Sequence, residues 1–467
     1  NNGAVMEARS SNLPPMAAAM APSGVGSVPP PSVPLGFLVA AGVGGTGFGL
    51  ATWFAADRVV SAPTHPGALA AVHVGVLALL TTAVLGAVHQ FAPVVAGRPL
   101  RSVAAARLTL VGMVLTAWLL PSGFAHGPEA LVATGGVVGS ITVLVAAWNL
   151  SGPLSQRGRG VPLVGLRLSV AYLVLTVAFG VVYAFDRQTG WFPLLPHRVL
   201  AHAHLGLLGW LGLTYVAVSE KLWPMFLLSH RPRARSGTWA VGLLATGTLV
   251  LATGLLFALE PVALVGGATV AAGLACHLTS LVATLRHRRR PLELLHAHLA
   301  TSSAFLVAGM APAVAAGLGD VDPGTRTTLV ASEVASLLAW IALAVTGHAH
   351  KIVPFIAYTW LRRLGVTQDP GGRPLLFGDL FHHGVARATF ATGALSWLAV
   401  VVGLVVEHPT TVAAGGGGLA LTAVGVTLNL WSGPRRARRR GTPAPAAPPA
   451  TEGATTRPAL VNAGSER

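Results

Sequence analysis

The chain is poor in charge and in cysteine, and each scarcity excludes a class of protein. Only 10% of its 467 residues are charged, whereas about a quarter are charged in a soluble domain. This composition excludes an ordinary soluble protein. The single cysteine, Cys276, excludes an intrachain disulfide and the paired cysteines that attach c-type haem. The N-terminus lacks a basic segment followed by an apolar core, so we expect no cleaved signal peptide.

Apolar residues are abundant instead, at 53% of the chain with a mean hydropathy of +0.65. The apolar stretches approach the roughly 20 residues that a helix needs to cross a bilayer. The sequence therefore predicts an all-α integral membrane protein with about 12 transmembrane helices. We place them at 34–56, 66–95, 104–121, 129–150, 164–185, 199–228, 238–259, 261–285, 292–318, 328–355, 385–406 and 411–431.

The net charge of +16 is distributed by topology. Loops after every second stretch carry cations such as Arg98 and Arg101, and the alternate loops carry acids such as Asp57 and Glu129. By the positive-inside rule we expect both termini to be cytoplasmic, in a bacterial cytoplasmic membrane. The cations are not gathered on one soluble face, so we expect the lipid bilayer as a partner and no nucleic acid.

The two ends of the chain differ in composition from the membrane domain, which we expect at 34–431. Residues 1–33 and 432–467 are rich in Pro, Ala and Gly and are predicted to be disordered. The cluster Arg435 to Arg440 opens the tail as an anchor for lipid headgroups. The sequence does not begin with methionine, and the candidate start residues are Met6, Met16 and Met20.

A proline-anchored motif recurs three times on these apolar stretches. It reads His89-Gln-Phe-Ala-Pro93, Glu220-Lys-Leu-Trp-Pro224 and His350-Lys-Ile-Val-Pro354, with steps of 131 and 130 residues between the prolines. Further upstream, His73 and His204 each stand 20 residues before the proline of their own copy. The spacing predicts three pseudo-symmetric four-helix units, at about 34–150, 164–285 and 292–431.

Histidines inside the spans fall into two layers of equal depth. An ionisable side chain within a membrane is costly and usually has a partner, so each layer is a candidate site. The outer layer holds His73, His202 and His204. The inner layer holds His89, His296, His298, His348 and His350, together with Glu220.

Three His-Ala-His triplets have a geometric meaning. Residues two apart on a helix differ by about 200° in direction, so the two rings cannot face one partner. The spacing suits a helix between two sites, each taking one histidine. Flat macrocycles fit that arrangement, because haem iron takes an axial imidazole. The alternative is that these histidines form structural hydrogen bonds between helices.

The segment from Ala201 to Trp210, which closes at Trp223-Pro224, is similar to a known pattern. Twelve helices in three arcs, with histidines near the outer ends of helices two and six, resemble the catalytic subunit of the haem-copper oxidase superfamily. That superfamily includes nitric oxide reductases, and the NnrS membrane proteins look like distant relatives. The resemblance implies one or two haem b groups, together with copper or non-haem iron.

The same resemblance implies roles for the histidines. His73 with His202 or His204 would form the outer axial pair, and His89, His348 and His350 would serve an inner haem. Candidate ligands for a further metal are His296, His298 and Glu220.

Two departures from the superfamily matter. Helix seven, about Gly237 to Leu259, has no histidine or tyrosine to complete an oxygen-reducing centre, and His348-Ala-His350 lies at the opposite end of helix ten. We therefore expect respiratory electron transfer, or nitric oxide reduction or response, with a quinol or an electron-donor subunit as partner. The alternatives are a secondary transporter for a transition metal such as copper and a non-catalytic subunit of a respiratory complex. Twelve-helix transporters usually repeat as two halves.

Overall fold

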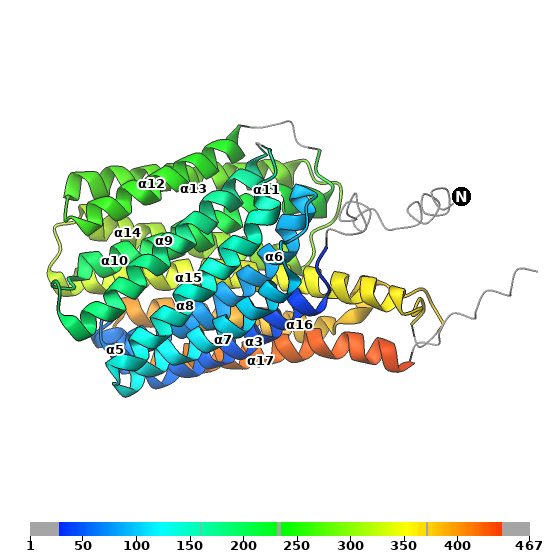
Figure 1. Cartoon of the computed structure of the whole chain (residues 1–467), viewed down its shortest axis with the longest axis horizontal. Helices are drawn as coiled ribbons and strands as arrows, with labels where there is room; N and C mark the ends of the chain where they lie inside the picture. Colours follow the sequence, from blue (N-terminus) through cyan, green and yellow to red (C-terminus); the bar gives the residue numbers. More distant parts are fainter. Residues whose placement is uncertain (1–27, 159, 231–234, 370–371, 441–467) are drawn as a thin grey trace, which may run out of the picture.

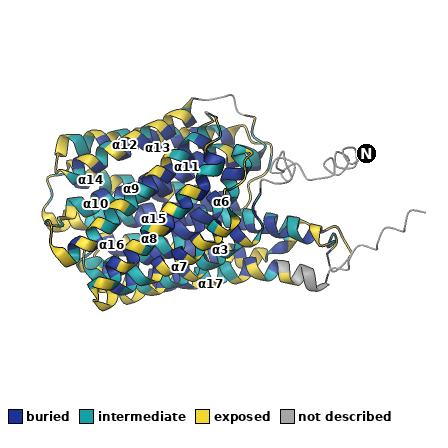
Figure 2. Cartoon of the chain, in the orientation of Figure 1, coloured by how far each residue is buried: buried dark blue, intermediate teal, exposed yellow. Residues whose placement is uncertain are grey.

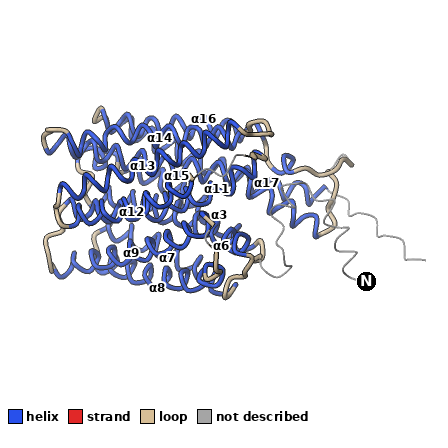
Figure 3. Tube along the Cα trace, turned by 90° about the horizontal axis from the view of Figure 1, so that it is seen from above, coloured by secondary structure: helices blue, strands red, loops and turns tan. Residues whose placement is uncertain are grey.

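The computed structural model describes residues 28–158, 160–230, 235–369 and 372–440. In these residues the chain folds into helices, and the one β-bridge recorded joins Gln368 to Pro374 (Figure 3). Of the predicted disordered segments 1–33 and 432–467, residues 1–27 and 441–467 lie outside the described residues, as do the candidate start methionines and the side chains of Pro434 and of 436–440.

Twelve helices of the described chain are long and apolar enough to cross a membrane, which confirms the predicted all-α integral membrane protein (Figure 1). Two of the spans are composite, because a π-helix interrupts each. The spans are α3 (Ser32–Phe54); α5 (Pro66–His73) with η1 (Val74–Thr81) and α6 (Thr82–Ala96); α7 (Val103–His126); α8 (Glu129–Leu154); α9 (Val161–Thr189); α10 (Pro196–His204) with η2 (Leu205–Gly212) and α11 (Leu213–Leu227); α12 (Ser236–Leu256); α13 (Glu260–Arg286); α14 (Leu294–Leu318); α15 (Pro323–Arg363); α16 (His383–Val405); and α17 (Pro409–Arg440).

Because the number of spans is even, α3 begins and α17 ends at the same end of the bundle, on the right in Figure 1. We call this end the N/C face and the other end the distal face. The most extensive helix contacts join α12 to α13, α14 to α15, α16 to α17, α17 to α3 and α7 to α8. The contact of α17 with α3 brings the first and last spans together and closes the bundle.

Large apolar side chains are exposed on the outside of the bundle, where a soluble protein would be polar, and Figure 2 marks the exposed positions in yellow. Leu421 on α17 is 71% exposed and Leu395 on α16 is 65% exposed, whereas the large side chains of Trp210 and Trp340 are fully buried. Lipid tails tolerate such a surface, and helices satisfy their backbone hydrogen bonds internally. The molecule therefore belongs in a lipid bilayer.

The two π-helices occupy corresponding positions in their spans. Segment η1 directly follows His73 and η2 directly follows His204, and each is 8 residues long. The Thr82 hydroxyl donates to the Leu77 carbonyl at 2.7 Å, five residues back, which satisfies a carbonyl of the widened turns. Trp210 Nε1 donates to Thr81 Oγ1 at 3.3 Å and so joins the two segments. Long π-helical stretches are rare and mark functional regions in many proteins.

Helix α15 is longer than predicted, with 41 residues against the predicted 328–355. Its start is fixed by Asp322, whose carboxylate accepts hydrogen bonds from the backbone amides of Gly324 and Thr325. The hydrogen bonds from the Thr325 hydroxyl and amide hold the pKa of the Asp322 carboxyl below its usual value. The carboxylate therefore stays charged at the positive end of the helix dipole.

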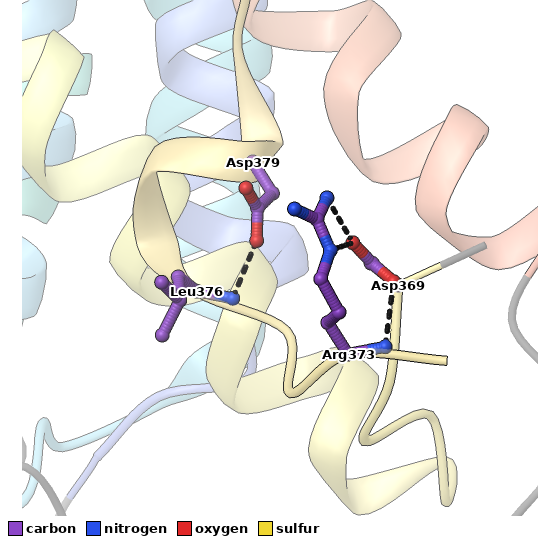
Figure 4. A network of polar contacts seen from close by, with 4 residues as sticks. All are labelled: Asp369, Arg373, Leu376 and Asp379. Carbon is purple, nitrogen blue, oxygen red and sulfur yellow. Dashed lines mark hydrogen bonds and ion pairs between the residues drawn. The ribbon is translucent and has the colours of Figure 1, made fainter. Parts of the chain in front are cut away.

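Beyond the span, α15 leads into a loop at the N/C face, of which residues 364–369 and 372–376 are described (Figure 4). The Arg373 guanidinium pairs with the Asp369 carboxylate at 2.7 Å, and the Leu376 amide donates to Asp379 Oδ2 at 2.7 Å. A small apolar cluster supports the loop and includes Tyr358 and Leu380. The short helix η3 (Phe377–Leu380) ends it. Helix α17 likewise continues to Arg440, past the predicted end of the membrane domain at 431.

The contact of α3 with α17 depends on small residues. A Cβ atom added at Gly49 would lie 2.6 Å from the Gly416 carbonyl oxygen and still closer to the Ala420 amide nitrogen, whereas one added at Gly267 on α13 would meet nothing within 4 Å. We expect Gly49→Ala to lower the free energy of unfolding by about 1–3 kcal/mol, as overpacking does. Gly267→Ala is the control and should be neutral or slightly stabilising. Thermal unfolding in detergent measures both, and equal stability of the two variants would contradict the close contact.

Candidate functional site

The candidate histidines share one local hydrogen bond. Six of the eight place ring Nδ1 at 2.7–3.0 Å from the carbonyl oxygen four residues earlier in the helix. A carbonyl only accepts, so Nδ1 carries a proton, and in a neutral ring Nε2 is left with its lone pair. These six are His73, His89, His204, His298, His348 and His350. His296 and His202 differ, because Nδ1 of His296 accepts from a backbone amide and Nδ1 of His202 has no partner among the described residues.

Three rings of the inner layer leave a nitrogen unused. Nε2 of His89, His348 and His350 is buried, with no hydrogen-bond partner in the part of the chain that the structure describes. The His89 ring is fully buried and stacks on Phe37 with centroids 5.6 Å apart. An unpartnered polar atom is costly in an apolar interior. These three atoms are the strongest sign of a ligand in the bundle.

The two histidines of α15 face different neighbours, as the 200° separation predicts. The His348 ring lies 6.1 Å from Tyr215 and 6.2 Å from Phe226, both on α11. The His350 ring lies 5.3 Å from that of His298 on α14. Helix α15 therefore presents one imidazole to each side.

The predicted metal ligands do not come together. The Glu220 carboxylate accepts from the Ser280 hydroxyl at 2.5 Å. His296 belongs to the capping box that starts α14, with Nδ1 2.8 Å from the Glu293 amide, and His298 contacts His350. Among the described residues, no group of three or more His, Cys, Asp or Glu side chains could hold a metal ion.

In the outer layer, His204 is already paired. Its Nε2 lies 3.2 Å from Glu333 Oε1 on α15, and the two side chains are only 6% and 13% exposed. Both ring nitrogens of His204 are thus engaged, which leaves His202 as the freer ring of that triplet. His202 packs on Tyr183 with centroids 5.9 Å apart.

A chain of contacts from three helices positions His73. The His73 ring stacks on Phe124 of α7 with centroids 5.1 Å apart. The Arg187 guanidinium in turn lies 5.1 Å from the centroid of the Phe124 ring. Arg187 of α9 in turn forms two hydrogen bonds to Glu129 of α8, at 2.8 and 2.6 Å. The ion pair of Arg187 and Glu129 at the distal face thus helps to position Phe124, which packs against His73.

One buried histidine was not predicted as a site residue. His277 on α13 is 0% exposed, and neither of its ring nitrogens has a partner among the described residues. Its ring lies 5.5 Å from that of Tyr215, which also contacts Trp340 at 5.6 Å. The sequence could have indicated His277 as a site residue, because it falls inside the predicted span 261–285, where an ionisable residue is costly.

The chain matches no family model. It matches no curated protein.

The contact between His204 and Glu333 leads to a prediction about the free energy of unfolding. Glu333→Ala leaves Nε2 of His204 buried without a partner and should lower the free energy of unfolding by about 1–3 kcal/mol. The double variant with His204→Ala should lose less than the sum of the single losses, with a coupling of about 0.5–3 kcal/mol. Thermal unfolding in detergent of the unchanged protein, the two single variants and the double variant measures these losses as a double-mutant cycle. Asp57→Ala, at an exposed acid, serves as the control. Strict additivity of the two single losses would contradict a direct interaction.

Proposed function

We propose that this protein binds haem b through histidines of its inner layer and works in electron transfer or in nitric oxide chemistry. One observation carries the proposal: Nε2 of His89, His348 and His350 is buried without a partner, while Nδ1 of each ring donates to a carbonyl. Imidazoles that ligate metals usually have their second nitrogen bonded in this way. The donor set therefore fits axial ligation of haem iron.

The chain's own residues would bind and orient the cofactor. The carbonyl bonds keep each imidazole in one tautomer, and apolar neighbours such as Phe37 keep water away from His89. The bound haem would supply one-electron chemistry, or an open iron position for nitric oxide. Because His348 and His350 face different sides of α15, one inner haem takes only one of them, so we assign His350 to that haem and a structural role to His348.

A second haem is proposed at the outer layer, with His73 and His202 as its ligands. Support comes from the pairing of His204 with Glu333, which engages the remaining ring of the triplet. In this arrangement His204 is a positioning residue. We do not propose a separate copper or non-haem iron centre, because His296, His298 and Glu220 have other contacts.

The pseudo-symmetric arrangement of three four-helix units is part of the proposal. Its support is the recurrence of local structure in corresponding spans of different units. The π-helices after His73 and His204 correspond, and Asn149 Oδ1 accepts from the Ser102 amide as Asn429 Oδ1 accepts from the His382 amide. Both amides open a span, and both asparagines lie near the end of the span that follows.

We further propose that the N/C face is cytoplasmic, in a bacterial cytoplasmic membrane. Support comes from cations such as Arg98, Arg286 and Arg362 near this face. The electron donor would be a quinol or a partner subunit.

The test is the absorption spectrum of the purified protein in detergent. We expect the reduced-minus-oxidised bands of b-type haem, and we expect His89→Ala and His350→Ala each to remove most of the inner haem. His287→Ala is a matched control, because Nδ1 of this exposed histidine also bonds a carbonyl four residues back. A colourless protein that carries stoichiometric copper would favour the transporter. A colourless protein that copurifies with respiratory subunits would favour the non-catalytic subunit.

A further inference from the structure

An apolar cavity of about 120 Å³ lies between α3, α15, α16 and α17. Among the described residues that line it, His298 alone is ionisable, and its Nδ1 already donates to the Leu294 carbonyl. Threonine hydroxyls on the wall are also engaged, since those of Thr346 and Thr422 each donate to a carbonyl of their own helix at 2.8 Å. The cavity therefore offers few polar contacts and suits an apolar occupant.

The cavity has the depth of one leaflet. On α17 its lining residues extend from Leu419 to Trp431, which is about 18 Å at 1.5 Å per helical residue. On α3 they extend from Leu35, near the N/C face, to Phe48. Half of a bilayer's hydrocarbon core is about 15 Å thick. An acyl chain that enters from the leaflet at the N/C face would fill this length.

The mouth of the cavity at the N/C face is positively charged. The Arg435 guanidinium lies 5.0 Å from the centroid of Trp431, a lining residue, and it follows the apolar part of α17, which ends at Gly433. Cations at this level attract anionic lipid headgroups.

We propose that the cavity binds one acyl chain of an anionic phospholipid from this leaflet, with the phosphate at Arg435. The bilayer supplies acyl chains at this depth, and the charge at the mouth selects the headgroup. The proposal is independent of the haem. Because His89, His348 and His350 do not line the cavity, loss of either ligand need not affect the other.

Native mass spectrometry of the full chain in mild detergent tests the proposal, with phosphatidylglycerol and phosphatidylcholine of equal chain length as probes. We expect one retained phosphatidylglycerol. Val426→Phe fills the cavity and should reduce retention more than about tenfold, because displacing two buried methylenes already has that effect. Val424→Phe is the matched control, on the same helix but facing outward with 40% exposure and not lining the cavity.

The headgroup is tested by Arg435→Gln, which should weaken phosphatidylglycerol about fivefold and phosphatidylcholine less, because the choline cation of phosphatidylcholine offsets its phosphate. Arg286→Gln, at the end of α13, is the control. Equal losses in Val424→Phe and Val426→Phe would overturn the proposal, as would a protein that retains no phospholipid. Retention of haem or a quinone in the cavity would also overturn it.

A second measurement tests for an acyl chain in the cavity without a substitution that fills the space. Trp397 lines the cavity and is 4% exposed, so lipids around the bundle cannot reach it. Phosphatidylglycerol with brominated acyl chains should quench part of the tryptophan fluorescence, and Trp397→Phe should remove that part. Trp340→Phe, at a fully buried tryptophan away from the cavity, should leave it unchanged. Equal quenching before and after Trp397→Phe would show that no chain enters.

Discussion

Each polar group inside a bilayer must find its partner within the protein, and the rest of this structure depends on how the histidines meet that requirement. A ring in a helix can donate to the carbonyl one turn back, and six candidate rings do so. The bond satisfies one nitrogen and turns the other outward. Whatever binds at Nε2 of His89 or His350 therefore meets an imidazole whose direction is already set.

Helix α15 connects the two histidine layers. Near the distal face its Glu333 contacts His204, and near the N/C face its His348 and His350 point to α11 and α14. Trp340 lies between these levels against Tyr215. A single helix thus contacts both candidate sites.

Composition and periodicity were sufficient to predict the twelve spans, because hydrophobic length and loop charge are properties of the chain alone. The opposed directions of His348 and His350 also follow from helix geometry. The neighbours of each side chain do not, because they depend on which helices pack together. Glu220 sits at a position equivalent to His89, yet it accepts from Ser280 rather than joining a metal site. His277 could have been found by its depth, but not its contact with Tyr215.

The π-helices change the angular relation between the two ends of their spans. A regular α-helix turns by about 100° per residue, so 20 residues from His73 to Pro93, or from His204 to Pro224, would fix one relative direction. Eight residues of wider turn in each span alter that direction by the same amount in both. A helical wheel drawn across either span therefore assigns the outer and inner residues to the wrong relative faces, and the two spans share the same phase shift.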